Sequence, residues 1–202
     1  RVSRARAQLA MSKFRDLLFL EDDKTSRERA INETLQYLPT TIDGNGLCAY
    51  WPGGEANVSL TAWVVQFLSE VRKGGYPIDE KMYSRMLRGL ERSLRSDCHW
   101  LVDGYSWLER CWALIALTDA GRTTRSWSTE LARKTQYLDA EAQANVVLAM
   151  AQGGDGATSA VSELTDELWK SLIFRLYQGK RMYGGFQENS LGGGAVILSS
   201  ET

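Results

Sequence analysis

The sequence predicts an all-α protein, an α/α toroid of helical hairpins in which inner and outer helices alternate. Apolar residues recur at helical spacing along most of the 202 residues. Helices that are apolar on almost every side alternate with helices that have one charged face, and short glycine-containing links join them. Two layers of packed helices bury such faces, and the uneven spacing of the glycines disfavours a tight solenoid repeat.

Size and charge exclude several classes of function. A chain of 202 residues fits one large domain, and we expect a single domain over 1–202. The formal net charge is −1 with interspersed signs, which disfavours nucleic acid and anionic membranes as partners. No apolar run approaches the roughly 20 residues of a membrane span, so no membrane insertion is expected. The chain begins without Met, and we expect a piece of a longer protein.

The first two predicted helices precede a long loop. Apolar positions at helical spacing predict a helix over 2–20. A capping box of Thr25 with Glu28 predicts the start of a second helix, which stops at Pro39. The stretch 40–57 contains Asp-Gly and Gly-Gly pairs, which are typical of a loop.

The next helices differ in character. Residues 59–77 are apolar on almost every side in the central turns, which predicts a helix buried all round. Residues 79–95 combine one apolar face with a heavily charged one, which predicts an outer helix.

The same alternation continues to a glycine-rich tail. Residues 105–122 and 139–154 predict buried helices, and residues 126–137 and 159–177 predict amphipathic ones. That makes about eight helices, whereas a closed ring of six hairpins needs about twelve, so we expect an incomplete ring. The tail 180–202 breaks helical periodicity, and its apolar run at 195–198 predicts a short hairpin.

Several segments resemble one known family. AYWPGGEANVSLTAWVVQFLSEVRKGGYP is similar to the thioester-containing domain of bacterial alpha-2-macroglobulins, where an aromatic-Trp-Pro-Gly-Gly loop precedes a Leu-Thr-Ala-aromatic helix. YSWLERCWALIALTDAGR resembles the next inner helix of that complement-like domain. RLYQGKRMYGGFQE, followed by AVILSSET, resembles a short extended insertion of the bacterial branch, and RVSRARAQLAMSKF resembles the helix after the reactive motif.

The resemblance implies a function in protease inhibition without enzymatic turnover. In that family a cysteine and a glutamine form an internal thioester, and an attacking protease is captured once by acyl transfer. The chain is then part of a broad-spectrum protease inhibitor in bacterial defence, a scaffold without cofactors. Its implied partners are target proteases and the β-sandwich domains of the same longer protein. The implied location is periplasmic or extracellular, with a lipid-anchored parent as one form.

The reactive motif itself does not occur in the sequence. None of the three cysteines, Cys48, Cys98 and Cys111, is followed by the x-Glu-Gln that the family requires. Two alternatives stay open: the motif precedes Arg1, or this protein is a structural toroid that lacks the thioester.

His99 is the only histidine and a candidate for acting beside the thioester, as complement-type relatives use a histidine. Its neighbours, DCHWLVDG, do not match that motif, so an ordinary loop histidine is the preferred interpretation. The adjacent residues Asp97, Cys98 and His99 do not readily surround one tetrahedral ion, so no metal site is predicted.

A carbohydrate-active α/α barrel is the main alternative. Inverting glycosidases use two carboxyl groups, and Asp103, Glu109 and Glu141 lie near the starts of inner helices. Acidic residues there also complement the helix dipole without any catalysis, which is the preferred interpretation.

Aromatic residues could stack on a sugar. Tyr50 and Trp51 lie in the glycine-rich loop and are the candidate binding residues, with a loop anchor that closes the end of the ring as the competing interpretation. Four other tryptophans occupy apolar helical positions and are predicted to lie in the core: Trp63, Trp107, Trp112 and Trp169.

Overall fold

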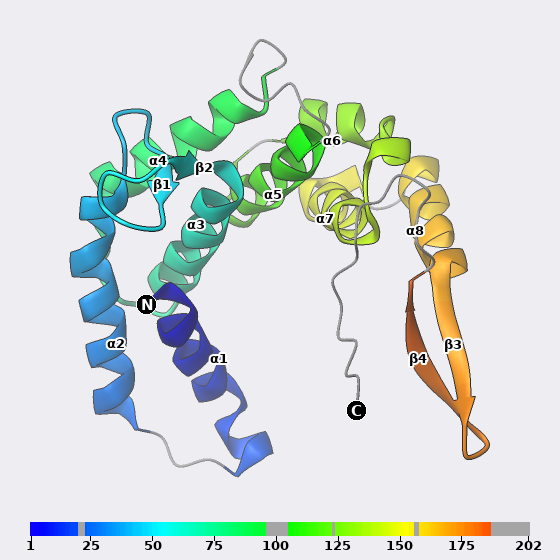
Figure 1. Ribbon diagram of the computed structural model, residues 1–202, viewed down its shortest axis with the longest axis horizontal. Coiled ribbons are helices and arrows are strands. Elements are labelled where there is room, and N and C mark those ends of the chain that lie inside the picture. The colour runs from blue at the N-terminus through cyan, green and yellow to red at the C-terminus, as the bar shows by residue number, and fades with distance from the viewer. Residues whose placement is uncertain (20–22, 96–104, 123, 156–157, 187–202) are drawn as a thin grey trace. The chain divides into compact units, whose positions relative to one another are not determined.

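The computed structural model describes residues 1–19, 23–95, 105–122, 124–155 and 158–186 (Figure 1). They form two compact units, Arg1–Arg95 and Ser96–Thr202, and each is considered by itself. The α-helices of this described part are α1 (Val2–Leu18), α2 (Lys24–Tyr37), α3 (Val58–Lys73), α4 (Glu80–Ser93), α5 (Tyr105–Asp119), α6 (Arg125–Ala132), α7 (Ala140–Met150) and α8 (Ser159–Ser171). The strands are β1 (Cys48–Ala49), β2 (Ala56–Asn57), β3 (Leu172–Tyr177) and β4 (Lys180–Phe186). The prediction of an all-helical chain with an extended insertion near its C-terminus is confirmed.

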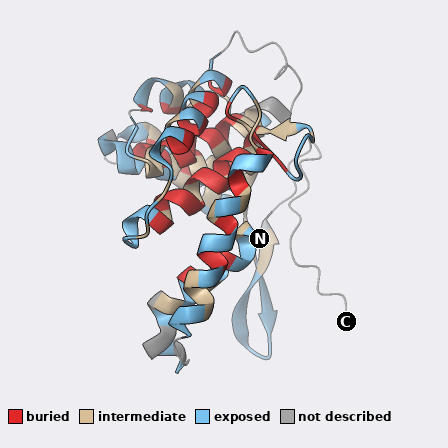
Figure 2. Cartoon of the chain, turned by 90° about the vertical axis from the view of Figure 1, so that its left-hand side faces the viewer, coloured by how far each residue is buried: buried red, intermediate tan, exposed pale blue. Residues whose placement is uncertain are grey.

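The N-terminal unit consists of two helical hairpins. Helix α1 packs against α2 and α3, and α3 packs against α4. Every residue of α3 from Val58 to Val71 is buried or half-buried, as predicted, whereas α4 is buried on one face only (Figure 2). The largest fully buried side chains of this unit include Ile31, Val64, Val65, Phe67, Leu68, Val71, Met86 and Leu90.

Helix α2 begins earlier than the capping box predicted. Its N-cap is Asp23, whose carboxylate accepts a hydrogen bond from the backbone N–H of Ser26 at 2.9 Å. Thr25 therefore lies inside the first turn, and the predicted start was wrong because an aspartate two residues upstream supplies the stronger cap. The predicted stop is close: α2 ends at Tyr37, and a short 3₁₀ turn, Leu38–Thr41, accommodates the proline.

The C-terminal unit repeats the pattern of inner and outer helices. Helix α5 packs against α7, α6 packs against both, and α8 packs against α7. Residues Arg110–Leu117 of α5 are all buried except Trp112, which is half-buried. On α7, Ala142, Val146, Ala149 and Met150 complete this core.

A β-hairpin replaces the end of the helix predicted over 159–177. Helix α8 ends at Ser171, and β3 pairs antiparallel with β4 through the two-residue turn Gln178-Gly179. Both turn residues have positive φ, 49° and 75°, which is the type I′ geometry that suits a tight hairpin. The prediction failed because LIFRLY is rich in the β-branched and aromatic residues that favour strands. The hairpin predicted at 195–198 lies outside the described residues.

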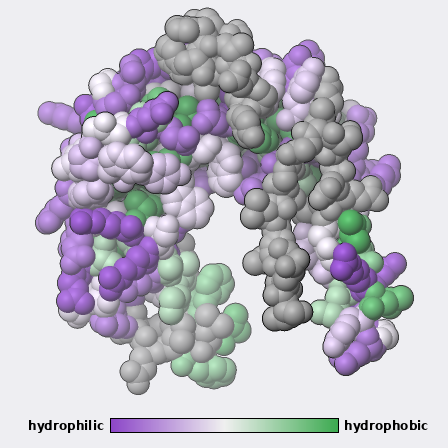
Figure 3. Space-filling view, in the orientation of Figure 1, coloured by the Kyte–Doolittle hydropathy of each residue, from purple (hydrophilic) through white to green (hydrophobic). Residues whose placement is uncertain are grey.

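The β3–β4 hairpin is exposed on both faces. Leu176 is 79% exposed and Tyr177 62% exposed, and the strands are drawn almost wholly in the exposed colour in Figure 2. Hydrophobic and hydrophilic surface is mixed along it in Figure 3. Trp169, at the end of α8, is 64% exposed, so its predicted place in the core was wrong, whereas Trp63, Trp107 and Trp112 are half-buried.

None of the helices in the described ranges is both long enough and apolar enough to cross a membrane.

Candidate functional site

The loop that carries Tyr50 and Trp51 is a small β-hairpin at the start of α3. Strand β1 pairs antiparallel with β2, with Cys48 opposite Asn57. At the tip, the N–H of Gly54 donates a hydrogen bond to the carbonyl of Trp51 at 3.0 Å, across Pro52-Gly53. Gly53 has φ of 73°, so the tip is a type II turn, for which proline followed by glycine is the preferred pair.

The base of this hairpin is fixed to α3 by one buried hydroxyl group. The N–H of Cys48 donates a hydrogen bond to Thr61 Oγ1 at 2.7 Å, and the Thr61 hydroxyl donates to the carbonyl of Asn57 at 2.7 Å. The side-chain oxygen of Asn57 accepts from the N–H of Leu60 at 2.8 Å and caps α3. The two strands and the helix start are therefore held as one rigid element.

The turn before β1 is docked on α4 through two glycines. Asp43 organises this turn by accepting hydrogen bonds from the N–H groups of Asn45 and Leu47, at 2.9 and 2.8 Å. Gly46 has φ of 83°, and a Cβ there would lie 2.5 Å from the Arg85 carbonyl oxygen. A Cβ on Gly89 of α4 would lie 3.0 Å from the Asn45 carbonyl oxygen. Sequence reasoning missed this contact, although an isolated glycine in an amphipathic helix is a signal of close backbone approach.

The tip presents two aromatic rings to solvent. Tyr50 is 68% exposed and Trp51 63% exposed, and their ring centroids lie 6.3 Å apart at a tilt of 35°. The Trp51 ring rests on Gly54, where a Cβ would come within 2.8 Å of the indole Nε1. A rigid base with exposed aromatic faces is suited to stacking or to insertion into a partner, which is binding chemistry.

The remaining candidate residues lie elsewhere. His99 and Asp103 lie outside the described residues. Burial raises the pKa of Glu109 on α5, and burial followed by the nearby charge of Asp139 raises the pKa of Glu141 on α7. Glu141 lies in the first turn of α7, where an acidic side chain complements the helix dipole.

The described cysteines are poor nucleophiles. Burial, with a smaller contribution from Asp43, raises the pKa of the Cys48 thiol to about 12, against a smaller opposing effect of Thr61. Burial also raises the pKa of Cys111. Because the thiolate is the reactive form, both side chains are protonated and unreactive near neutral pH. Among the residues that the structure describes, no group of three or more His, Cys, Asp or Glu side chains is arranged to hold a metal ion.

The fold is similar to part of bacterial alpha-2-macroglobulin. Neither a family model nor a curated protein sequence matches the chain. The native conformation of Escherichia coli alpha-2-macroglobulin matches with a TM-score of 0.72 at 18% identity, over 84% of this chain and 11% of that one. The Salmonella alpha-2-macroglobulin reacted with methylamine matches with a TM-score of 0.72 at 17% identity, over 84% of this chain and 12% of that one.

A structure of only the C-terminal part of the E. coli protein also matches the chain. An E. coli structure that spans domain MG7 to the C-terminus matches with a TM-score of 0.69 at 16% identity, over 84% of this chain and 28% of that one. The chain thus spans only a small part of the length of the proteins it resembles. The resemblance drawn from the sequence is confirmed at the level of fold.

Proposed function

We propose that this chain is part of the thioester-domain scaffold of a bacterial alpha-2-macroglobulin-like, broad-spectrum protease inhibitor and is not itself an enzyme. The observation that carries the proposal is the fold match over 84% of the chain, which extends to a fragment that begins at domain MG7. Structures of the matching E. coli protein were obtained after activation by trypsin and by porcine elastase, and the Salmonella protein was reacted with methylamine.

In this proposal the chain supports an acylating group that lies elsewhere in the longer protein. The sequence has no Cys-x-Glu-Gln, and its described thiols are buried and protonated. Proteases are then partners only through the full-length protein, whose β-sandwich domains adjoin this one. The corresponding location is periplasmic or extracellular.

We assign a binding role, and no catalytic one, to the aromatic tip. Tyr50 and Trp51 are exposed on a base fixed by Thr61, so their replacement leaves the fold intact. In the full-length protein, the double variant Tyr50→Ala, Trp51→Ala is expected to weaken inhibition of a protease such as trypsin without changing thermal stability. Trp169→Ala, which removes another exposed indole, is the matched control.

Methylamine treatment of the full-length protein tests the proposed function. An intact thioester is attacked by the amine at the glutamine carbonyl, the C–S bond breaks, and the sulfur leaves as a free thiol. Mass spectrometry should find one methylamine adduct on a glutamine outside this chain, together with one new free thiol. His99→Ala in the same protein should leave the yield of the adduct unchanged, because we interpret His99 as an ordinary loop histidine.

Two results would redirect the proposal. If the full-length protein contains no Cys-x-Glu-Gln and methylamine adds nowhere, the scaffold is a structural toroid without covalent chemistry. If the protein in addition hydrolyses glycosides and Glu109→Gln abolishes that activity, the carbohydrate-active alternative is correct, since the raised pKa of Glu109 suits a general acid.

A further inference from the structure

A row of cationic side chains runs along the outer face of α4. Its members share one helical face because they follow one another at spacings of four and three residues. All are exposed, and the opposite face of α4 packs against α3. We call them the cation row: Lys81, Arg85, Arg88, Arg92 and Arg95.

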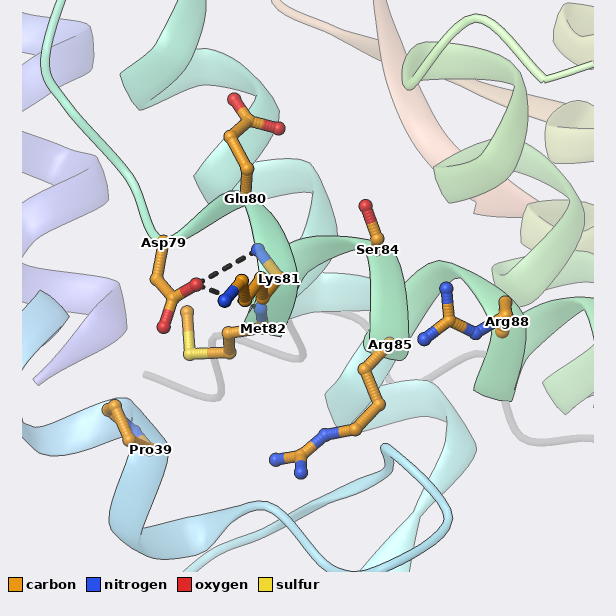
Figure 4. Close-up of a pocket in the computed structure, with 8 residues that line it drawn as sticks. All are labelled: Pro39, Asp79, Glu80, Lys81, Met82, Ser84, Arg85 and Arg88. Atoms are coloured by element: carbon orange, nitrogen blue, oxygen red, sulfur yellow. Dashed lines mark hydrogen bonds between the residues drawn. The ribbon is translucent and has the colours of Figure 1, made fainter.

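The cation row lines two adjoining hollows of the N-terminal unit. The larger, about 670 Å³, lies beside Pro39 and Met82 and is drawn in Figure 4. The smaller, about 450 Å³, lies beside Asn45 at the docked turn. Arg85 and Arg88 line both hollows, so the two form one shallow groove along the helix.

Two carboxylates in the larger hollow are engaged with other groups. Asp79 caps α4, accepting hydrogen bonds from the N–H groups of Lys81 and Met82 at 2.9 and 3.0 Å (dashed in Figure 4). Glu80 forms an ion pair with Arg72 at 3.2 Å. Within the described part of the chain, the side chains of Arg85 and Arg88 form no ion pair. The two arginines shared by the hollows therefore make the centre of the groove positive.

The wall of the smaller hollow is held in place by the docked turn. The guanidinium of Arg92 donates a hydrogen bond to the Asn45 carbonyl, and Gly46 and Gly89 permit the close approach of the two backbones. The groove thus has a preformed wall, which lowers the ordering cost of binding.

We infer that this groove binds an acidic, extended segment of a partner protein. Arginine is the side chain best shaped to grip a carboxylate through two parallel hydrogen bonds. From Lys81 to Arg95 the row spans about 21 Å at a rise of 1.5 Å per residue, which matches roughly six residues of extended chain. Pro39 and the side chain of Met82 offer an apolar contact beside the cations. A side chain of a peptide can use such a contact, whereas a simple anion cannot.

Other anionic ligands fit less well. A membrane surface would need apolar side chains to enter the interface, and no large hydrophobic side chain is exposed between residues 79 and 95. A uniformly charged polymer such as a sulfated polysaccharide would meet the carboxylates of Asp79, Glu80 and Glu91 along the same groove. A peptide of mixed composition avoids both problems.

Fluorescence anisotropy with a labelled acidic peptide of mixed composition, Glu-Leu-Glu-Glu-Leu-Glu, tests the inference on the 202-residue chain at low ionic strength. The chain should bind this peptide, not its counterpart with glutamine in place of every glutamate, and Arg85→Glu with Arg88→Glu should weaken binding at least about tenfold. The matched control, Arg133→Glu with Lys170→Glu, changes two exposed cations of the C-terminal unit and should change affinity less than about twofold. Arg85→Lys with Arg88→Lys keeps the charge and should still lose several-fold in affinity, since lysine has no planar fork.

Three results would overturn the inference. The first is that the folded wild-type chain does not bind the mixed acidic peptide. An equal loss in the control variant is the second, because the attraction would then be to overall charge. The third is tighter binding of heparin, or of phosphatidylglycerol vesicles, with the same dependence on Arg85 and Arg88, since the groove would then accept a polysaccharide or a lipid surface. Circular dichroism of each variant confirms that it is folded.

Discussion

Both β-hairpins of the molecule expose aromatic side chains, but only one of them is fixed to neighbouring helices. The β1–β2 hairpin has strands of only two residues, yet Thr61, Asp43 and the docked turn fix it to α3 and α4. The β3–β4 hairpin has strands of six and seven residues, but its side chains are mostly exposed, and the contact of Arg181 with the Phe174 ring lies within the hairpin itself. A two-stranded hairpin alone is marginally stable in water. Rigidity therefore comes from the anchoring of a hairpin and not from the number of paired residues.

Gly46 provides the strongest test of this anchoring. An alanine there meets the Arg85 carbonyl oxygen at 2.5 Å and is forced to φ of 83°, so Gly46→Ala should lower the free energy of unfolding by about 3 kcal/mol. Gly53→Ala is the control, because φ is also positive but the space is open, and only about 1 kcal/mol should be lost. Urea unfolding followed by circular dichroism measures both. Equal losses would show that the docked turn contributes no specific contact.

Thr61→Val removes the hydroxyl while keeping the shape of the side chain. The variant leaves the buried N–H of Cys48 without its acceptor. Because a buried N–H group without a partner is costly, the free energy of unfolding should fall by about 2 kcal/mol. Thr165→Val is the control, because that hydroxyl bonds only to the Val161 carbonyl within α8, and the change should stay below about 0.5 kcal/mol. Hydrogen exchange should also show faster exchange at Cys48 in the Thr61 variant alone.

Much of the fold, and part of this comparison, can be predicted from the sequence. The spacing of apolar residues predicts which faces of a helix are buried. It therefore distinguished α3, which is apolar on almost every side, from α4, which has one charged face. Tyr50 and Trp51 were identified as loop aromatics because a proline and two glycines follow them.

Two predictions from the sequence were wrong because two local patterns compete at the same place. Asp23 and Thr25 both offer an oxygen to cap α2, and only the fold decides between them. The segment 172–177 continues the apolar positions of α8 without a break, so helix and strand patterns overlap there. The contact between Gly46 and α4 joins residues far apart in the sequence. Gly89 in the amphipathic α4 signals a close approach, but no local pattern tells which segment approaches it.

The buried thiol of Cys48 makes the stability of the anchored hairpin depend on pH. Its pKa is raised from 9.0 to about 12, so above pH 9 the unfolded chain loses this proton while the folded chain keeps it. The free energy of unfolding should therefore decrease as pH rises above 9, by up to about 1.4 kcal/mol per pH unit for this thiol. Cys48→Ala should reduce that slope, with the buried Cys111 thiol accounting for a remaining part. An unchanged slope would mean that Cys48 is accessible in the folded state.

The smallest effect is expected in the β3–β4 hairpin. Leu176 is 79% exposed, so Leu176→Ser removes almost no burial and should change the unfolding free energy by less than about 0.5 kcal/mol in the 202-residue chain. Trypsin should cut first after Lys180 or Arg181, beside the turn, in both the wild type and the variant, because exposed loop tips are cleaved most readily. A loss of 2 kcal/mol, or resistance of this turn to trypsin, would mean that the hairpin packs against apolar surface in solution. The two hairpins would then be anchored alike, and exposed aromatic residues would mark rigid contacts in both.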